Sequence, residues 1–479
     1  MQSKGWAVPA AGHGPVTAKP LSIAAVITVL ALVGVYLVCV AEDVEFYFFL
    51  VAFSTVVAVT AILEFEASLV YIPLTLTNPY TLAETGTRLH LSELVLLIIF
   101  SVWFLRLLFL EERQYLDRRF LIPAVLVILA AMASYMVARF PMETVRQTIR
   151  YVEVMLVFFV MMTNSARDEE RIKRMVLYLI VGGLLASFVG IGQFLTGEMA
   201  KGETRRIFGW HGGGYGALIG ATIVLSVVGL LRERRRGIRF WSLVTLPFAG
   251  VVIVLAQTRA WIGSLAIVLI FLLFRPRREV IVRLLVTLAI GVAAVFVIVE
   301  TEAFGMVDKR VIEGALQRSF RFVGSQRNFQ LEDLSIFMRA NIWLLGVRLF
   351  LEHPLTGIGV GSLRIADYFT GRLGTLEEGM GYVDNQYLQF FAEGGIVAGI
   401  AWIAYITAGV VAGIQALRVS RGTRLHAAAL GLFGSYLIFV IGSFFWVITP
   451  HHELFALMVP YTALLVNIRR VLAPKAETS

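Results

Sequence analysis

The stretch LSIAAVITVLALVGVYLVCV, residues Leu21–Val40, holds 20 residues without a single charged side chain. A helix of this length spans about 30 Å, which is the thickness of the hydrocarbon core of a bilayer. It is longer than the roughly 7–15 residues of a signal-peptide core, and no clear small-residue cleavage site precedes Glu42 and Asp43. The stretch therefore predicts a retained first membrane helix.

Similar apolar blocks recur along the chain of 479 residues. Hydrophobic residues make up 58% and charged residues 16%, whereas soluble domains carry about 25% charged residues. This composition excludes a soluble globular enzyme, and 34 Phe, 15 Tyr and 8 Trp exclude a disordered chain. Further blocks lie near residues 44–60, 64–78, 92–110, 120–138, 150–163, 175–194, 215–231, 240–256, 260–274, 284–300, 394–417, 427–447 and 454–468. They predict an all-α polytopic membrane protein with about 14 transmembrane helices (12–14).

The basic residues indicate how the helices are oriented. They collect in loops 111–119, 164–174, 232–239, 275–283 and 418–424, which are each two helices apart and therefore share one face. Short loops rich in Lys and Arg stay in the cytoplasm. We therefore expect a cytoplasmic N-terminal tail (1–20) and a cytoplasmic C-terminal tail (469–479). The net charge of +9 follows from this topology and from contact with anionic membrane lipid, so no nucleic-acid partner is expected.

One outer connection is much longer than the others. About ninety residues, 301–393, separate membrane helices 1–11 (21–300) from membrane helices 12–14 (394–468). Loops of this length are usually functional or disordered, and this one contains an apolar helical stretch from Asp333 to Glu352. Asp333 or Ser335 is the expected N-cap, and Pro354 is expected to end the helix. The sequence thus predicts a large, partly helical outer loop where the chemistry takes place.

Two segments of the chain allow more than one interpretation. The block 64–78 contains Glu64, Glu66 and Pro73, so a re-entrant segment is an alternative to a membrane span. The Gly-x-Gly-x-Gly run at 357–361 follows a helix and a proline rather than a strand, which argues against a dinucleotide site.

A single cysteine and one adjacent His pair offer no spacing suited to zinc, so neither a metal nor a cofactor is expected.

Several arginines fall in the predicted outer loops. Arg205 and Arg206 lie in one loop, Arg259 lies where one helix ends and the next begins, and Arg339 lies in the apolar stretch of the long loop. A single arginine at such a place is most often structural. Several on one face indicate an anionic substrate, because a guanidinium matches phosphate oxygens with two parallel hydrogen bonds.

Short motifs follow one another in and after the long loop. They are Ser335-x-x-x-Arg339-x-x-x-Trp343, His353-Pro354-Leu355-Thr356-Gly357-Ile358-Gly359, Asp384-Asn385-x-Tyr387-Leu388 and Glu393-Gly394-Gly395-Ile396. In their order, spacing and place between late helices, they resemble the signature region of the O-antigen ligase and polymerase superfamily. Thr258-Arg259 and Arg206-x-x-Gly209 also lie where that family tends to carry an arginine.

The resemblance implies a glycosyltransferase in the bacterial inner membrane. Such an enzyme moves a glycan from undecaprenyl diphosphate, a polyprenyl carrier, to a glycan acceptor at the outer face; it is metal-independent and inverting, and a polymerase often works with a chain-length regulator. Charge builds on the diphosphate oxygens as the bond breaks, and positioned guanidinium groups stabilise it. The site residues implied are Arg206, Arg259 and Arg339 for the diphosphate, Asp384 as catalytic base, and Asn385, Tyr387, Gly357 and Gly359 in support.

One position departs from the family pattern. Ligases of the superfamily usually carry His before the Asn of the third motif, whereas this chain has Asp384. Aspartate is a weak base at its reference pKa of about 3.9, and the difference favours an exopolysaccharide or O-antigen polymerase over an O-antigen ligase or O-glycosylation ligase. Helix N-capping is an alternative role for Asp384. A lipid-linked oligosaccharide flippase is the alternative of another class, although it leaves the long outer loop unexplained.

Overall fold

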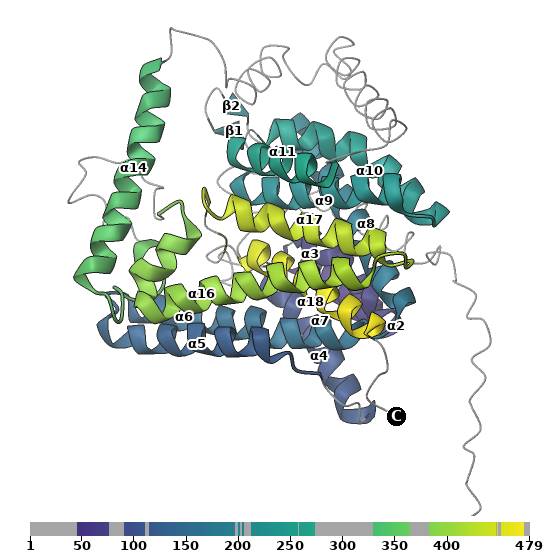
Figure 1. Ribbon diagram of the computed structural model, residues 1–479, viewed down its shortest axis with the longest axis horizontal. Coiled ribbons are helices and arrows are strands. Elements are labelled where there is room, and N and C mark those ends of the chain that lie inside the picture. The colour runs from purple at the N-terminus through teal and green to yellow at the C-terminus, as the bar shows by residue number, and fades with distance from the viewer. Residues whose placement is uncertain are drawn as a thin grey trace, which may run out of the picture.

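The fold of the chain is helical. The computed structural model describes residues 46–75, 91–110, 115–196, 200–201, 204–205, 212–256, 258–273, 329–364, 383–446, 448 and 452–473. Within these residues the helices form one bundle, shown in Figure 1, and the other regular elements are a short antiparallel pair, β1 (Ala200–Lys201) and β2 (Thr204–Arg205). The predicted all-α class is therefore confirmed.

The helices follow the apolar blocks of the sequence. They are α2 (Phe46–Leu63), η1 (Phe65–Val70), α3 (Tyr71–Thr75), α4 (Leu91–Leu110), α5 (Arg118–Ser134), η3 (Tyr135–Val137), α6 (Pro141–Tyr151), η4 (Val152–Phe158), α7 (Phe159–Ser165), α8 (Glu169–Thr196), α9 (Gly212–Arg232), α10 (Arg236–Leu255), α11 (Arg259–Leu273), α14 (Phe329–Glu352), η7 (Ser362–Arg364), α16 (Gln386–Val419), α17 (His426–Gly442) and α18 (His452–Leu472).

Six described helices are long and apolar enough to cross a membrane, and α2, α11 and α17 contain shorter apolar stretches. The expected count of about 14 transmembrane helices is not confirmed, because the predicted blocks 21–40 and 284–300 lie outside the described residues. The block 64–78 does not form one continuous helix. It begins with the 3-10 helix η1 and continues in the five-residue helix α3, and the side chains of η1 are buried.

Small residues allow the helices to approach closely. Gly409 and Gly413 of α16 lie against the rings of Tyr436 and Phe433 of α17, and a Cβ at either glycine would overlap those rings. Gly442, at the end of α17, lies in the same way against Trp261 of α11. Small residues at helix contacts are typical of membrane bundles, where close van der Waals packing holds the helices together.

Helix α14 lies outside the main core. In Figure 1 it runs across one end of the bundle, beside α6 and the first part of α16, instead of along the bundle. A separate small core joins it to the loop that follows and to the start of α16; its members are Ile342, Leu345, Leu349, Ile358, Leu363, Val383 and Ala392. The helix predicted for the outer loop is present and ends at Glu352, as expected. It begins at Phe329, so Asp333 and Ser335 lie inside it, and the expectation that one of them is the N-cap is wrong.

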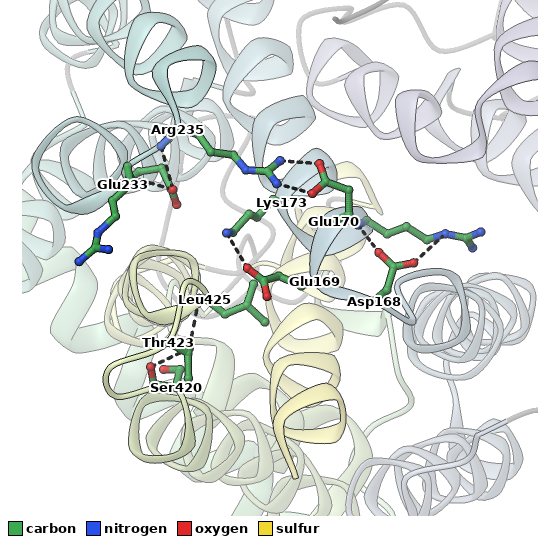
Figure 2. Close-up of polar contacts among 11 residues, drawn as sticks. Asp168, Glu169, Glu170, Lys173, Glu233, Arg235, Ser420, Thr423 and Leu425 are labelled. Carbon is green, nitrogen blue, oxygen red and sulfur yellow. Dashed lines mark hydrogen bonds and ion pairs between the residues drawn. The ribbon is translucent and has the colours of Figure 1, made fainter. Parts of the chain in front are cut away.

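Charged side chains gather at the other end of the bundle. Figure 2 shows Arg235, just before α10, donating two hydrogen bonds to Glu170 of α8, while Lys173 donates to Glu169 at 2.7 Å. Arg469 of α18 contacts Asp117 before α5 at 3.1 Å. The basic loops that precede α5, α8 and α10 therefore lie on one side, as the charge pattern predicts. That this side is cytoplasmic stays a prediction.

Candidate functional site

The opposite end of the bundle holds the signature loop, which we define as residues 353–364. Backbone hydrogen bonds attach this loop to α16, because Ile358 N donates to Ala392 O at 3.0 Å and Ile396 N donates to Pro354 O at 2.8 Å. On its other side, the Thr144 hydroxyl of α6 donates to Val360 O at 2.8 Å. The loop is therefore held between α6 and the start of α16.

Glycines make this close approach possible. Gly357, Gly359 and Gly361 have φ values of 64°, 99° and 81°, a left-handed region that glycine adopts at little cost. A Cβ at Gly357 would overlap the backbone of Glu393. The N–H groups of Gly357 and Gly359 donate to His353 O and Glu393 O, so both are engaged within the protein. The two glycines thus shape the loop, and their predicted support of the site remains a prediction.

Helix α16 is bent where the loop touches it. Gly395 has φ 71° and ψ −169°, which interrupts the helix close to the predicted start of the membrane segment at 394. A Cβ at Gly395 would overlap the backbone of Leu355. The kink therefore separates a first part of α16, residues 386–394, from the long apolar part that follows.

Glu393 is the carboxyl group at the centre of this contact. Its side chain is 3% exposed, and its two oxygens accept hydrogen bonds from Leu363 N and from the Gln389 amide, both at 3.1 Å. Sequence reasoning quoted Glu393 as part of a motif but gave it no role. The sequence feature that could have identified Glu393 is a single carboxylate beside two glycines at the start of an apolar helix.

A second buried charge lies on α6. Arg150 is 2% exposed, and its Nε contacts Glu93 Oε1 of α4 at 2.8 Å. Its Nη1 has no hydrogen-bond partner among the described residues. Sequence reasoning missed this residue because it opens the apolar block 150–163. An ionisable group beside such a block was the signal that could have found it.

The Asp384-Asn385 pair stands at the beginning of α16. Asn385 is the N-cap, and its side-chain oxygen accepts a hydrogen bond from Leu388 N at 3.0 Å. Asp384 precedes the cap and has φ 51°, the one positive φ among the described non-glycine residues. The alternative role of Asp384 as helix cap is therefore wrong. Backbone strain of this kind costs about 1–3 kcal/mol and clusters at functional sites.

The other predicted site residues are placed less completely. The Tyr387 hydroxyl donates to Val440 O at 3.0 Å, which ties α16 to α17. Arg259 is the first residue of α11 and Arg339 lies within α14, but their side chains, like the whole of Arg206, lie outside the described residues. The convergence of the three arginines on one substrate stays a prediction.

The described helices and this polar end define a multi-pass helical membrane protein. Residues 244–403 match the family model described as O-antigen ligase. The match covers about a third of the chain, includes Arg259, Arg339 and Asp384, and supports the assignment to the O-antigen ligase and polymerase superfamily. None of the curated proteins compared with the chain matches it. The family assignment supports a membrane enzyme of the O-antigen ligase or polymerase type.

Proposed function

We propose that the protein is a glycosyltransferase that acts at the outer face of the bacterial inner membrane. It takes a glycan from undecaprenyl diphosphate and joins it to a hydroxyl group of a glycan acceptor, without a metal ion and with inversion at the anomeric carbon. The observation that carries this proposal is the family match over residues 244–403. It covers the signature loop and the start of α16, which lie in contact at one end of the bundle.

Each site residue has a defined role in this reaction. The Asp384 carboxylate accepts the proton of the acceptor hydroxyl, and that oxygen forms a bond to the anomeric carbon as the bond to the diphosphate oxygen breaks. Arg206, Arg259 and Arg339 stabilise the charge that builds on the leaving diphosphate. Asn385 caps α16 and so fixes the backbone beside Asp384.

Within this class, we favour a polymerase of exopolysaccharide or O-antigen. Asp384 supports this choice, because it stands where ligases of the superfamily usually carry His. Asn385, and not Asp384, is the N-cap of α16. Ligation to lipid A core or to protein is the second candidate, since the family match covers ligases as well.

Purified protein in nanodiscs, supplied with undecaprenyl-linked glycan, tests the proposal. The donor is extracted from a strain that lacks this protein, in which it should accumulate. A polymerase converts it into a ladder of glycans of increasing length, whereas a ligase forms a single product only when lipid A core or an acceptor protein is added. Addition of a chain-length regulator should narrow the ladder. Absence of any transfer in nanodiscs, together with movement of intact donor between the leaflets of sealed proteoliposomes that contain the protein, would instead identify a flippase.

A further inference from the structure

Helix α6 has its polar and apolar faces reversed relative to a helix on the surface of a soluble protein. Its exposed side chains are apolar, and include Met142 at 78% and Ile149 at 60% exposure. Its buried side chains are polar, and include Thr144, Gln147 and Arg150. An apolar outer face suits contact with acyl chains. A polar inner face indicates that the interior at this end of the bundle receives something polar, because intramembrane polar groups commonly mark substrate pathways.

Several polar atoms of this interior lack partners. Gln147 Oε1 and Arg150 Nη1 on α6, and Gln389 Oε1 on α16, are buried and have no hydrogen-bond partner among the described residues. Buried polar atoms are nearly always hydrogen-bonded, so each exception asks for an explanation. The chain also continues from α6 into the π-helical segment η4, a type of turn that occurs frequently at functional sites.

The unpaired atoms belong to one region of the structure. The ring of Tyr151, at the end of α6, lies 5.7 Å from the ring of Phe390 on α16. Gly361 of the signature loop packs against α6, because a Cβ built there would be 2.9 Å from Glu143 Cγ and 3.1 Å from Gln147 Cγ. Gln389 donates to Glu393, which in turn holds the loop. The polar face of α6, the loop and the first part of α16 thus pack against one another.

The chemistry of these groups favours neutral hydroxyl groups over phosphate. Two amide oxygens accept hydrogen bonds from O–H donors, and one guanidinium N–H donates to an oxygen. Arg146 and Arg150 are matched by three carboxyl groups, since Arg150 contacts Glu93, Arg146 contacts Glu143, and Glu393 is buried nearby. Among the described residues of this region, these positive charges do not exceed the carboxyl groups, which disfavours a diphosphate.

We propose that Gln147, Arg150 and Gln389 form a subsite that binds sugar hydroxyl groups of the lipid-linked glycan. This inference rests on the proposed function and names the part of the substrate that this polar interior recognises. The signature loop covers the subsite, and Ile358 and Leu363 of that loop belong to the small core with α14. For a glycan to reach the amide oxygens, the loop must part from α6, which breaks the hydrogen bond from the Thr144 hydroxyl to Val360 O.

Binding measurements on purified protein in nanodiscs test the subsite. The probes are the undecaprenyl-linked glycan extracted from a strain lacking this protein, undecaprenyl diphosphate without sugar, and the glycan released from its lipid by mild acid. Gln147→Met and Gln389→Met remove an amide at nearly constant volume. Ile149→Met introduces the same side chain on the lipid-facing side of α6 and serves as the matched control. Size-exclusion profiles show whether each variant remains folded.

We expect each Gln→Met variant to bind the undecaprenyl-linked glycan about three- to ten-fold more weakly, which corresponds to the loss of one hydrogen bond. Its affinity for undecaprenyl diphosphate should not change, and Ile149→Met should bind both lipids like the wild type. If the released glycan competes with the lipid-linked glycan for the wild type but not for the variants, the sugars alone bind the subsite. If the released glycan does not compete while the variants still lose affinity, the subsite binds the glycan only when it is attached to its lipid.

Other results would overturn the subsite. Wild-type affinity of both Gln→Met variants for the lipid-linked glycan would mean that internal water satisfies the unpaired atoms. An equal loss for both lipids would assign the interior to the diphosphate. In either case, transfer by the wild-type protein would leave the proposed function intact. A wild type that binds neither lipid and transfers no glycan would remove both.

Discussion

The backbone N–H of Gly359 donates to the carbonyl oxygen of Glu393 at 3.0 Å. This bond joins the signature loop to the first part of α16 one residue before the two glycines that precede Ile396. Gly359 has φ 99°, and a Cβ there would overlap Ala138. The loop, the kink of α16 and the connection between η3 and α6 therefore pack closely together, and Asp384 precedes the first residue of α16.

The kink should be sensitive to a single methyl group. Gly395→Ala places a Cβ against the backbone of Leu355 and forces alanine into φ 71°. We expect a loss of at least about 2 kcal/mol in the free energy of unfolding, seen as a lower Tm in detergent, and a loss of transfer activity. Gly263→Ala in α11, where a Cβ meets open space, is the control and should keep or raise the Tm. An unchanged Tm in Gly395→Ala would contradict the bent helix.

Asp384→Asn separates base catalysis from folding. Asparagine adopts positive φ as readily as aspartate, and Asn385 remains the cap, so the Tm should not change. Because the amide cannot accept the proton, turnover should fall by about 10²- to 10⁴-fold in the purified system. Asp384→His restores the residue usual in related ligases and should keep partial activity. Wild-type turnover in Asp384→Asn would remove Asp384 from the mechanism.

Asn385→Ala should give the opposite pattern. It removes the hydrogen bond to Leu388 N and should destabilise the protein by about 1 kcal/mol. At temperatures below the Tm of Asn385→Ala, the rate of the chemical step should fall much less than in Asp384→Asn, because the Asp384 carboxylate remains. Parallel thermal unfolding and initial-rate measurements on the two variants compare these effects directly. Equal loss of turnover in both variants would assign a chemical role to Asn385 as well.

The activity should depend on the shape of the guanidinium group at Arg259 and Arg339 as well as on its charge. Arg259→Ala and Arg339→Ala should abolish glycan transfer while protein levels in the membrane stay normal, since each is proposed to hold diphosphate oxygens. Lysine at either position should restore only part of the activity, because it keeps the charge but cannot form the two parallel hydrogen bonds of a guanidinium group. Arg421→Ala, an exposed residue at the charged end of the bundle, should be silent. Full activity of both Ala variants would refute the diphosphate site.

Cysteine labelling tests which end of the bundle faces outward. In a Cys39→Ala background, His353→Cys should react with a membrane-impermeant maleimide in intact cells, because His353 is exposed beside the signature loop. Gly237→Cys, exposed at the other end, should react only after the membrane is opened. The reverse pattern would invert the topology and place the proposed site in the cytoplasm.

Membrane helices could be predicted well because a segment needs little more than sufficient length and hydrophobicity to span a bilayer. The block 215–231 became α9 (Gly212–Arg232), and 427–447 became α17 (His426–Gly442). The block 64–78 differed because Glu64 lies against Tyr178 and Arg174 of α8. These contacts join residues that are more than 100 positions apart in the sequence, so the local sequence pattern of 64–78 does not predict where the segment is interrupted.

The candidate site could be predicted only in part. The motif around Asp384 pointed to the correct helix end, but the choice of cap depends on backbone angles, with Asp384 at φ 51° and Asn385 extended. The polar face of α6 was missed because Glu143, Gln147 and Arg150 precede or open an apolar block and look like part of a loop. Their spacing of four and three residues places them on one helical face, but only the packing against the signature loop and α16 shows that this face is buried.

The small core around α14 has a consequence for how the protein opens. It is a cluster apart from the main core of the bundle and contains few side chains, whereas Val360 and Phe390 belong to the main core. We therefore expect α14 to form a cooperative unfolding unit of its own. Amide protons in this unit should exchange with deuterium at a common rate, faster than those of α9 or α17. Fluctuations that admit a bulky glycan would then leave the membrane-embedded bundle closed to ions.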